Sequence, residues 1–461
     1  MPPGVMQLET DAALQEAIEA IGGNVEPLAS SGMGLLNSYA AVFVAAFVVT
    51  LLATPLVRRL ALRANLTDCP DGGRKLHSYP VAYLGGVAVF LGLIVAIAVS
   101  YFLVDGVAAH YRSVPNAIVL GIVVITFTGL ADDVWGWDPR LKIAGQLVAA
   151  AALAVQDVGV KVAAGLLRPV ASWLGPLLGN EDLIFMIPAP GGDIPIDLIY
   201  WAGTAIIAMF VLGGCNAANL LDGLDGLLSG VVAVVAIGLL CISVLMALHP
   251  PAGAEIGDQG LAGARVVLCL ALLGVSLGFL PHNFNPASVF LGDCGSHLLG
   301  YVCVVIILMF GEFGQTHLVF AGLIIFAVPI IDTMLAIIRR WLAGKPMSVG
   351  DDQHVHHQLN RAMSSVKRAV FVMYSISAAF AVMGVTLAAL VMFTQLRVRI
   401  VYAVALLLFG FIGVIAVKTV SRERQLQGRT AVIGRPSEVR EKPSAVSGQR
   451  SAASGQLPAD S

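Results

Sequence analysis

The sequence predicts an all-α polytopic membrane protein with about eleven transmembrane helices. Of its 461 residues, 57% are hydrophobic and only 12% are charged, and the mean hydropathy is +0.85. Because a soluble domain carries roughly 25% charged residues, this chain has too little polar surface to cover a water-soluble globule. These figures exclude a secreted disulfide scaffold, a nucleic-acid-binding protein with a basic surface and a disordered tail protein.

Long apolar runs predict the membrane spans in order. A bilayer core of about 30 Å requires roughly 20 apolar residues per helix. Runs that meet or nearly meet this length begin near residues 34, 81, 115, 141, 198, 227, 261, 297, 316, 369 and 397. No run repeats at a fixed period, so the sequence shows no sign of a solenoid or of inverted repeats.

The distribution of Lys and Arg predicts an N-terminus outside and a C-terminus inside the cell. With that orientation the inside segments hold all but six of the 27 basic residues, and the outside keeps Arg112, Lys161, Arg168, Arg265, Arg397 and Arg399. Residues 1–33 form an extracytoplasmic segment without the basic start of a signal peptide. We expect residues 34–420 to form the membrane-embedded domain. Residues 421–461 lack apolar periodicity, so we expect them to form a disordered cytoplasmic tail.

One outside loop differs from the others. Residues 183–187 and 194–199 are short apolar stretches separated by the Pro and Gly turn signals of residues 188–193. We expect a small β-hairpin on the outer face. The six cysteines lie mostly within or beside apolar runs and without CxxC spacing, so we interpret them as small hydrophobic residues.

Unusual polar residues gather in five segments, and the predicted topology places all five on the cytoplasmic side. The first runs from Asp68 to His77 and contains Arg74 and Lys75; Gly85-Gly86 follows it. Glycine amides can approach an anion, and the neighbouring cations add charge. The alternative is a basic membrane anchor beside a tight turn.

The second segment places Asp132 and Asp133 at the inner end of the third span, with Lys142 and Gln146 at the start of the fourth. Two adjacent carboxylates at a membrane boundary raise each other's pKa unless a cation neutralises them. This pattern indicates a Mg²⁺ site or a general base; a polar helix end is the alternative.

In the third segment, amides and carboxylates recur every three residues at Asn216, Asn219, Asp222 and Asp225. This spacing places helical neighbours along one stripe. The acids have no basic neighbour within the segment, so a divalent cation or a cationic loop from elsewhere must compensate them. The segment lacks the twelfth-position Glu of a calcium loop, which excludes that class of site.

The fourth segment places a single acid, Asp293, between glycines in a tight loop, where it is a candidate metal ligand. The fifth contains His354, His356 and His357 in a cytoplasmic loop. Three histidines could bind zinc, but no cysteine or further histidine completes a closed set nearby, so contacts to a phosphate or sugar fit better.

Together the segments predict an acid-rich Mg²⁺-type site on the cytoplasmic side, ringed by Arg, Lys and His. Hard oxygen ligands suit Mg²⁺ bound to a diphosphate, with Mn²⁺ as a substitute ion, and the basic residues offset phosphate charge. The function predicted from the residues is phosphoryl transfer at the membrane surface.

The order of these motifs resembles that of the polyprenyl-phosphate N-acetylhexosamine-1-phosphate transferases, within glycosyltransferase family 4. The motifs are RKxH…GG from Arg74, DD…K…Q from Asp132, NxxNxxDGxDGL from Asn216, FxGDxGS from Phe290 and HxHH from His354. The resemblance runs from about residue 34 to residue 420.

The resemblance implies an eleven-span inner-membrane enzyme that transfers a sugar 1-phosphate from a UDP-sugar to undecaprenyl phosphate and releases UMP. It implies that Asp293 and Asn219 bind Mg²⁺, that Asp132 and Asp133 lie near the lipid phosphate, and that Asp132 is the candidate base. The remaining implied site residues are Lys142 at a phosphate, Asp222 and Asp225 in the catalytic or nucleotide pocket, and Arg74, Lys75, His77, Asn216, His354, His356 and His357 at the substrates.

Within the family, RKxH and the single HxHH motif resemble the branch that uses UDP-N-acetylglucosamine to start a cell-envelope polysaccharide. The chain departs from that branch at Asp352 and Gln358, where Arg is usual, so the donor sugar stays open. The alternatives are a phospho-MurNAc-pentapeptide transferase of peptidoglycan synthesis and, from another class, an ion-coupled transporter. Transporter sites lie near the bilayer midplane, whereas these acids lie at span ends. The resemblance leaves a homodimer open.

Overall fold

The computed structural model describes residues 32–69, 80–102, 114–163, 165, 184–188, 192–249, 261–344, 354–394 and 397–408, with isolated positions to 418. Nearly all of the described chain is helical, as the composition predicts. The N-terminal segment, the segment with Arg74, Lys75 and His77, and the tail after residue 418 lie outside the described residues.

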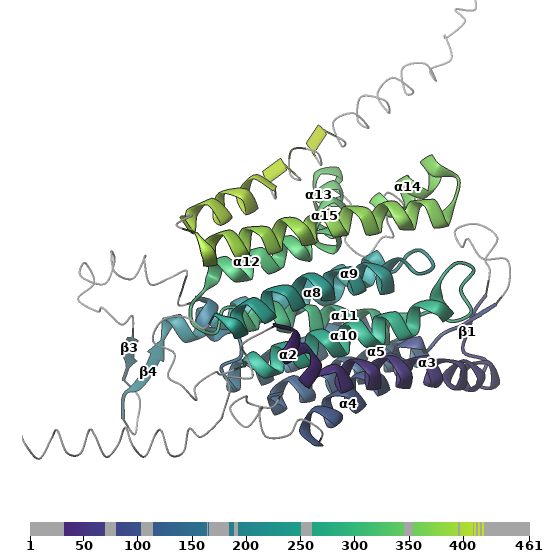
Figure 1. Ribbon diagram of the computed structural model, residues 1–461, viewed down its shortest axis with the longest axis horizontal. Helices are drawn as coiled ribbons and strands as arrows, with labels where there is room; N and C mark the ends of the chain where they lie inside the picture. The colour runs from purple at the N-terminus through teal and green to yellow at the C-terminus, as the bar shows by residue number, and fades with distance from the viewer. Residues whose placement is uncertain are drawn as a thin grey trace, which may run out of the picture.

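The helices pack side by side into one bundle (Figure 1). In chain order they are α2 (Gly32–Ser38), α3 (Ala40–Arg63), α4 (Gly85–Phe102), α5 (Asn116–Trp135), α6 (Pro139–Val155), α8 (Leu198–Leu221), α9 (Leu227–Leu248), α10 (Ala262–Asn283), α11 (Gly292–Met309), α12 (Thr316–Ile325), α13 (Ala327–Ala343), α14 (Val355–Met363) and α15 (Val366–Phe393).

Among the described residues, eight helices are long and apolar enough to cross a membrane: α3, α4, α5, α8, α9, α10, α11 and α15. The pair α12 and α13 bends by 78° and gives a ninth crossing if the two form one span. The fourth expected span is the 17-residue helix α6, and the last is an apolar helix over Arg399–Leu408. An all-α polytopic membrane protein is therefore confirmed, whereas the count of eleven and the N-out orientation stay predictions.

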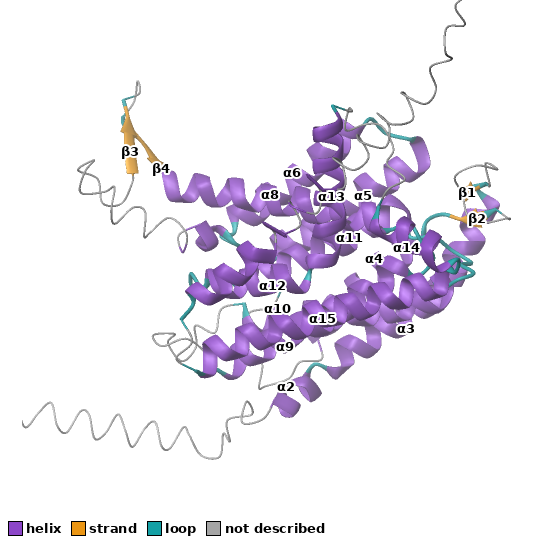
Figure 2. Ribbon diagram, turned by 90° about the horizontal axis from the view of Figure 1, so that it is seen from above, coloured by secondary structure: helices purple, strands orange, loops and turns teal. Residues whose placement is uncertain are grey.

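Two short hairpins accompany the bundle. Strand β3 (Ile184–Ile187) pairs antiparallel with β4 (Ile194–Asp197), which confirms the hairpin expected from the Pro and Gly signals. Strands β1 (Thr67–Asp68) and β2 (Val81–Ala82) form the other hairpin, so residues expected to begin the second span are extended instead. In both views β3 and β4 lie at the opposite end of the bundle from β1, β2 and α14 (Figures 1 and 2).

Helix α11 is the centre of the bundle. Its membrane-length window is 94% buried inside the protein, against 28% for α3, α8 and α15. Glycines allow its neighbours to approach closely, as small residues do between membrane helices. A Cβ at Gly129 of α5 would lie 2.6 Å from Cys294 Cα, and one at Gly300 would lie 2.4 Å from the Gly214 carbonyl oxygen of α8. These contacts bring the ends of α5 and α8 to the first turn of α11.

Candidate active site

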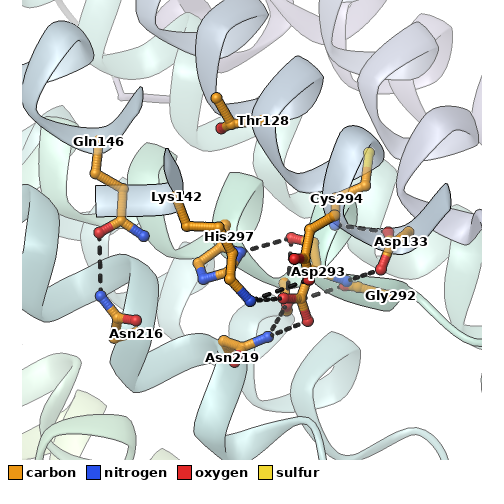
Figure 3. A network of polar contacts seen from close by, with 12 residues as sticks. Thr128, Asp133, Lys142, Gln146, Asn216, Asn219, Gly292, Asp293, Cys294 and His297 are labelled. Carbon is orange, nitrogen blue, oxygen red and sulfur yellow. Dashed lines mark hydrogen bonds and ion pairs between the residues drawn. The ribbon is translucent and has the colours of Figure 1, made fainter. Parts of the chain in front are cut away.

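Three of the five polar segments converge at one end of the bundle. Asp132 and Asp133 lie in the last turn of α5, Lys142 in the first turn of α6, Asn219 in the last turn of α8, and Asp293 in the first turn of α11. In Figure 3 the side chains of Lys142 and Asn219 point toward Asp293. Residues that are up to 161 positions apart in the sequence thus form one polar cluster, which we call the acidic cluster.

Lys142 is the cation that joins two of these carboxylates. Its Nζ donates to Asp132 Oδ2 at 3.0 Å and to Asp293 Oδ2 at 2.8 Å. The three side chains are between 17% and 25% exposed, so water reaches the cluster from one side. Charge-assisted hydrogen bonds of this kind are stronger than neutral ones. One ammonium group therefore holds carboxylates of α5 and α11 together.

Asp133 binds the backbone rather than a cation. Its Oδ1 accepts the Asp293 N–H at 2.8 Å, and its Oδ2 accepts the Cys294 N–H at 3.0 Å. The first N–H groups of a helix have no partner within the helix, and negative charge is favoured there. The expectation that Asp293 lies in a loop, with the span starting near residue 297, is wrong. The helix begins at Gly292, because α5 supplies the cap that the local sequence lacks.

Two asparagines tie α8 to the cluster. Asn219 Nδ2 donates to Asp293 Oδ1 at 2.8 Å and to Ser296 Oγ at 2.9 Å. One turn earlier, Asn216 Nδ2 donates to Gln146 Oε1 of α6 at 3.1 Å. Because the amide nitrogen of Asn219 faces Asp293, its amide oxygen is the atom that could bind a metal.

The last two acids of the third segment have different surroundings. Asp222 follows α8, and burial, together with the charges of Asp293, Asp133 and Asp225, raises the pKa of its carboxyl group to about 8. Asp225 Oδ2 instead accepts the Asn285 side-chain amide at 2.9 Å and the Ala287 N–H at 3.0 Å. The stripe expected from the three-residue spacing ends where α8 ends, at Leu221, so Asp225 lies in a loop that it anchors.

Gly85 and Gly86, which follow the first segment, also lie near this site, but their N–H groups are not available to an anion. The Gly85 and Gly86 N–H groups donate to the carbonyl oxygens of Phe290 and Leu291, each at 2.9 Å. A Cβ at Gly86 would lie 2.2 Å from the Gly295 backbone nitrogen. The idea that this glycine pair approaches an anion is therefore wrong; the glycines allow α4 to pack against the start of α11.

The histidines of the fifth segment lie at the start of a helix rather than within a loop. His354 precedes α14, and His356 and His357 are in its first turn. Asp332 of α13 accepts hydrogen bonds from two of them. Its Oδ2 lies 3.1 Å from His354 Nδ1 and 3.0 Å from His356 Nδ1. These three residues are the one metal-type grouping of His, Cys, Asp or Glu in the described chain. The two Nδ1 atoms and the Asp332 carboxylate are, however, already engaged in hydrogen bonds to one another.

Sequence reasoning did not single out three polar residues that the structure places here: Asp332, His297 and Tyr83. His297 Nδ1 lies 2.9 Å from the Asp293 carbonyl oxygen. Burial raises the pKa of the Tyr83 phenol, and Asp68, Asp133, Asp222 and Asp293 raise it further, because a phenolate would add negative charge. Asp332 and His297 each interrupt an apolar run, and that signal could have identified them.

The acidic cluster has donors that fit a divalent metal ion. Asp132 and Asp293 share one ammonium group, and burial, followed by the charges of Asp293, Asp133 and Asp225, raises the pKa of Asp222 beside them. Carboxylate and amide oxygens are the ligands that Mg²⁺ prefers. The oxygen donors of the acidic cluster could hold such an ion.

Comparison with known proteins identifies the family. The family model described as glycosyl transferase family 4 matches residues 116–311. The decaprenyl-phosphate N-acetylglucosaminephosphotransferase of Mycobacterium tuberculosis (strain ATCC 25618 / H37Rv) is 31% identical over 379 residues, covering 77% of this chain and 84% of the relative.

Other relatives carry related names. The probable undecaprenyl-phosphate N-acetylglucosaminyl 1-phosphate transferase of Bacillus subtilis (strain 168) is 29% identical, over 75% of this chain and 84% of its own. The phospho-N-acetylmuramoyl-pentapeptide-transferase of Bacillus cytotoxicus is 27% identical, over 76% of this chain and 97% of its own. The region matched by the family model contains α5, α6, α8 and α11, whose ends form the acidic cluster. The chain belongs to glycosyl transferase family 4.

Proposed function

We propose that the chain is a phosphoglycosyl transferase that moves N-acetylglucosamine 1-phosphate from UDP-N-acetylglucosamine to undecaprenyl phosphate. The products would be the lipid pyrophosphate sugar and UMP, at the first membrane step of a cell-envelope polysaccharide. The relatives named for N-acetylglucosamine transfer to a polyprenyl phosphate support this donor and this acceptor. We propose residues 34–420 as the transferase domain and the inner membrane, with the site facing the cytoplasm, as its location.

The observation that carries the proposal is the contact of Lys142 with both Asp132 and Asp293 at the ends of three helices. Phosphoryl transfer leaves little covalent chemistry to the protein, which must position two phosphates and neutralise their charge. A site for two phosphates needs cations between its acids, and Lys142 already lies there. A transport pathway fits this site less well, because transporter sites lie near the bilayer midplane on broken helices, whereas these contacts lie at helix ends.

In the proposed mechanism, a side chain binds a phosphate, positions another residue or accepts a proton. Lys142 would bind phosphate oxygens once substrate displaces its carboxylate partners. Asp133, through the Asp293 and Cys294 N–H groups, fixes the orientation of Asp293. Asp132 is the proposed base for the lipid phosphate. A phosphomonoester has a second pKa near 6, so the acceptor is largely dianionic already and this role adds little rate near neutral pH.

We propose Mg²⁺, or Mn²⁺ in its place, as the metal, held by Asp293 and by the Asn219 amide oxygen, with Asp222 beside them. The ion would neutralise the charge that develops on the diphosphate during transfer. Asp222 and Asp225 would complete the catalytic and nucleotide pocket. Asp225 does so by anchoring the 285–287 loop through Asn285 and Ala287.

The donor would lie against the histidine segment and the first segment. His354, His356 and His357 are the proposed contacts to the sugar nucleotide, together with Asn216 and with Arg74, Lys75 and His77. A histidine ring can donate an N–H group to a phosphate oxygen or accept a hydroxyl O–H on its unprotonated nitrogen. Asp352 and Gln358 stand where the resembled branch usually has arginine, so two expected cations are missing from this region. Because these cations would lie near the donor, the donor sugar is the first property to measure.

The test is UMP release by membranes that carry the chain, with a panel of UDP-sugars that includes UDP-MurNAc-pentapeptide. We expect UMP from UDP-N-acetylglucosamine only when Mg²⁺ and a polyprenyl phosphate are both present. Asp293→Asn should abolish turnover while the protein stays in the membrane, because the carboxylate contacts Lys142 and Asn219. Release from the pentapeptide donor alone would favour the peptidoglycan enzyme, and no release with any donor would refute the proposal.

A further inference from the structure

A second group of buried polar residues lies outside the acidic cluster and joins α13 to the start of α14. Asp332 is 1% exposed, and its two carboxylate oxygens accept three hydrogen bonds. Oδ1 accepts the Val355 N–H at 2.7 Å, and Oδ2 accepts from His354 and His356 at 3.1 and 3.0 Å. One side chain thereby caps α14 and binds both histidines that flank the capped residue.

The acceptor chemistry of a carboxylate determines the state of both imidazole rings. An ionised carboxylate can only accept hydrogen bonds, so each Nδ1 that faces Asp332 must carry the proton. In a neutral imidazole the other nitrogen, Nε2, is then an acceptor. This is the arrangement in which carboxylates fix the tautomer and orientation of functional histidines in many sites.

His356 is aimed at the segment between Asn219 and Asp225. It is 1% exposed, and its Nε2 has no hydrogen-bond partner among the residues that the structure describes. A Cβ at Gly223 would lie 2.3 Å from this Nε2, so the ring edge contacts the backbone directly after Asp222. A buried polar nitrogen without a partner is costly, and its position indicates that a ligand group completes its hydrogen bonding.

We propose that Asp332 is a positioning residue for the donor substrate. It fixes His354 and His356 with Nδ1 protonated, and it presents His356 Nε2 to a hydrogen-bond donor of the sugar nucleotide, such as a sugar or ribose hydroxyl, beside Asp222. The inference rests on the proposed function for the presence of a sugar nucleotide. The tautomers and orientation of the rings do not depend on it.

Asp332→Asn is the informative variant. The side-chain oxygen of the introduced asparagine can still accept the Val355 N–H, which preserves the cap, but its NH₂ group now faces the two Nδ1 atoms. The proton must then move from Nδ1 to Nε2 on the rings that keep a hydrogen bond. We expect KM for the UDP-sugar to rise about tenfold, or about 1.4 kcal/mol, which is the size of effect expected from one lost hydrogen bond. KM for the polyprenyl phosphate should stay unchanged.

The matched control is Asp197→Asn, because Asp197 caps α8 through the N–H groups of Ile199 and Tyr200. This variant also replaces a carboxylate by an amide at the start of a helix. We expect it to retain KM for the UDP-sugar and KM for the polyprenyl phosphate. In Asp332→Asn, a lower kcat with unchanged KM for both substrates would indicate a structural role and overturn the proposal. One tightly bound zinc per purified wild-type chain, lost in Asp332→Asn, would also overturn it.

A measurement without turnover separates this inference from the proposed function. In protein with ¹⁵N-labelled histidine, NMR of the wild type should show two imidazoles protonated at Nδ1 that change to Nε2 in Asp332→Asn. If the wild type releases no UMP but shows these tautomers, the proposed function fails while the geometry stands. If no histidine changes its tautomer between the two proteins, the positioning role is wrong whatever the enzyme does.

Discussion

Replacing Lys142 by methionine should strengthen the binding of a divalent metal while it slows the reaction. Lys142 Nζ lies 2.8 Å from Asp293 Oδ2 and 3.0 Å from Asp132 Oδ2. If Asp293 is the metal ligand, as we propose, the ammonium competes with the metal for the same carboxylate. Methionine fills a similar volume without charge, so the variant removes the competitor and leaves the carboxylates in place.

The size of the effect follows from the exposure of the pair. A hydrogen bond to a charged group contributes about 1.5–3 kcal/mol when it is shielded from water. The Lys142 and Asp293 side chains are 25% and 24% exposed, and exposed ion pairs contribute about 0–1 kcal/mol. An intermediate value of about 1 kcal/mol corresponds to a roughly fivefold lower Kd for the metal. Loss of the phosphate contact should meanwhile lower kcat at least about a hundredfold, as for other transition-state donors.

Mn²⁺ binding to purified protein in nanodiscs, followed by electron paramagnetic resonance, gives the Kd without turnover. UMP release gives kcat in the same preparation. The control is Lys367→Met, the same substitution at an exposed lysine of α15, which should change neither quantity. Weaker or unchanged Mn²⁺ binding in Lys142→Met would refute the competition between ammonium and metal and, with it, the assignment of Asp293 as ligand.

Two further predictions concern the neighbouring acids. Asp133→Asn leaves one of the Asp293 and Cys294 N–H groups without its acceptor, which costs about 1–3 kcal/mol of folding free energy. The variant should therefore have a lower melting temperature and a lower kcat. The control Asp197→Asn should leave kcat unchanged. Asp222 has a pKa raised to about 8, so the stability it contributes is present at acidic pH and is lost as the pH rises through that value. Without metal, the melting temperature should therefore fall between about pH 4, the ordinary pKa of this carboxyl group, and about pH 8. Asp222→Asn should flatten this decline, and an equal decline in both proteins would contradict the raised pKa.

The sequence predicted the fold class and the residues of the acidic cluster for the same physical reason. Polar groups beside lipid are costly, so they are rare and stand out against apolar runs. Asp132, Lys142, Asn219 and Asp293 each lie at the edge of such a run, and the helices around α11 bring them together. The interpretation of the cysteines as small hydrophobic residues fits the four that are buried, whereas Cys69 and Cys241 are exposed.

The pairing of side chains with backbone could not be predicted in this way. Asp133 binds an N–H group that lies 160 residues later in the chain, and Gly86 packs against Gly295. A local sequence pattern contains no information about a partner so distant. The sequence reasoning therefore places the start of α11 too late, and it assigns the glycine pair an anion-binding role that its hydrogen bonds exclude.

Asp332 stands out in the sequence for the same reason as the residues of the acidic cluster. It is a lone acid within residues 323–338, where Thr333 is the one other polar residue. An acid at that position must have a partner, because an isolated carboxylate in lipid or in a protein core is strongly unfavourable. The groups that donate to it are the histidines of the HxHH motif, 22 and 24 residues later in the chain. The motif and the isolated acid therefore explain each other: the acid requires donors, and the histidines require an acceptor to fix their protons.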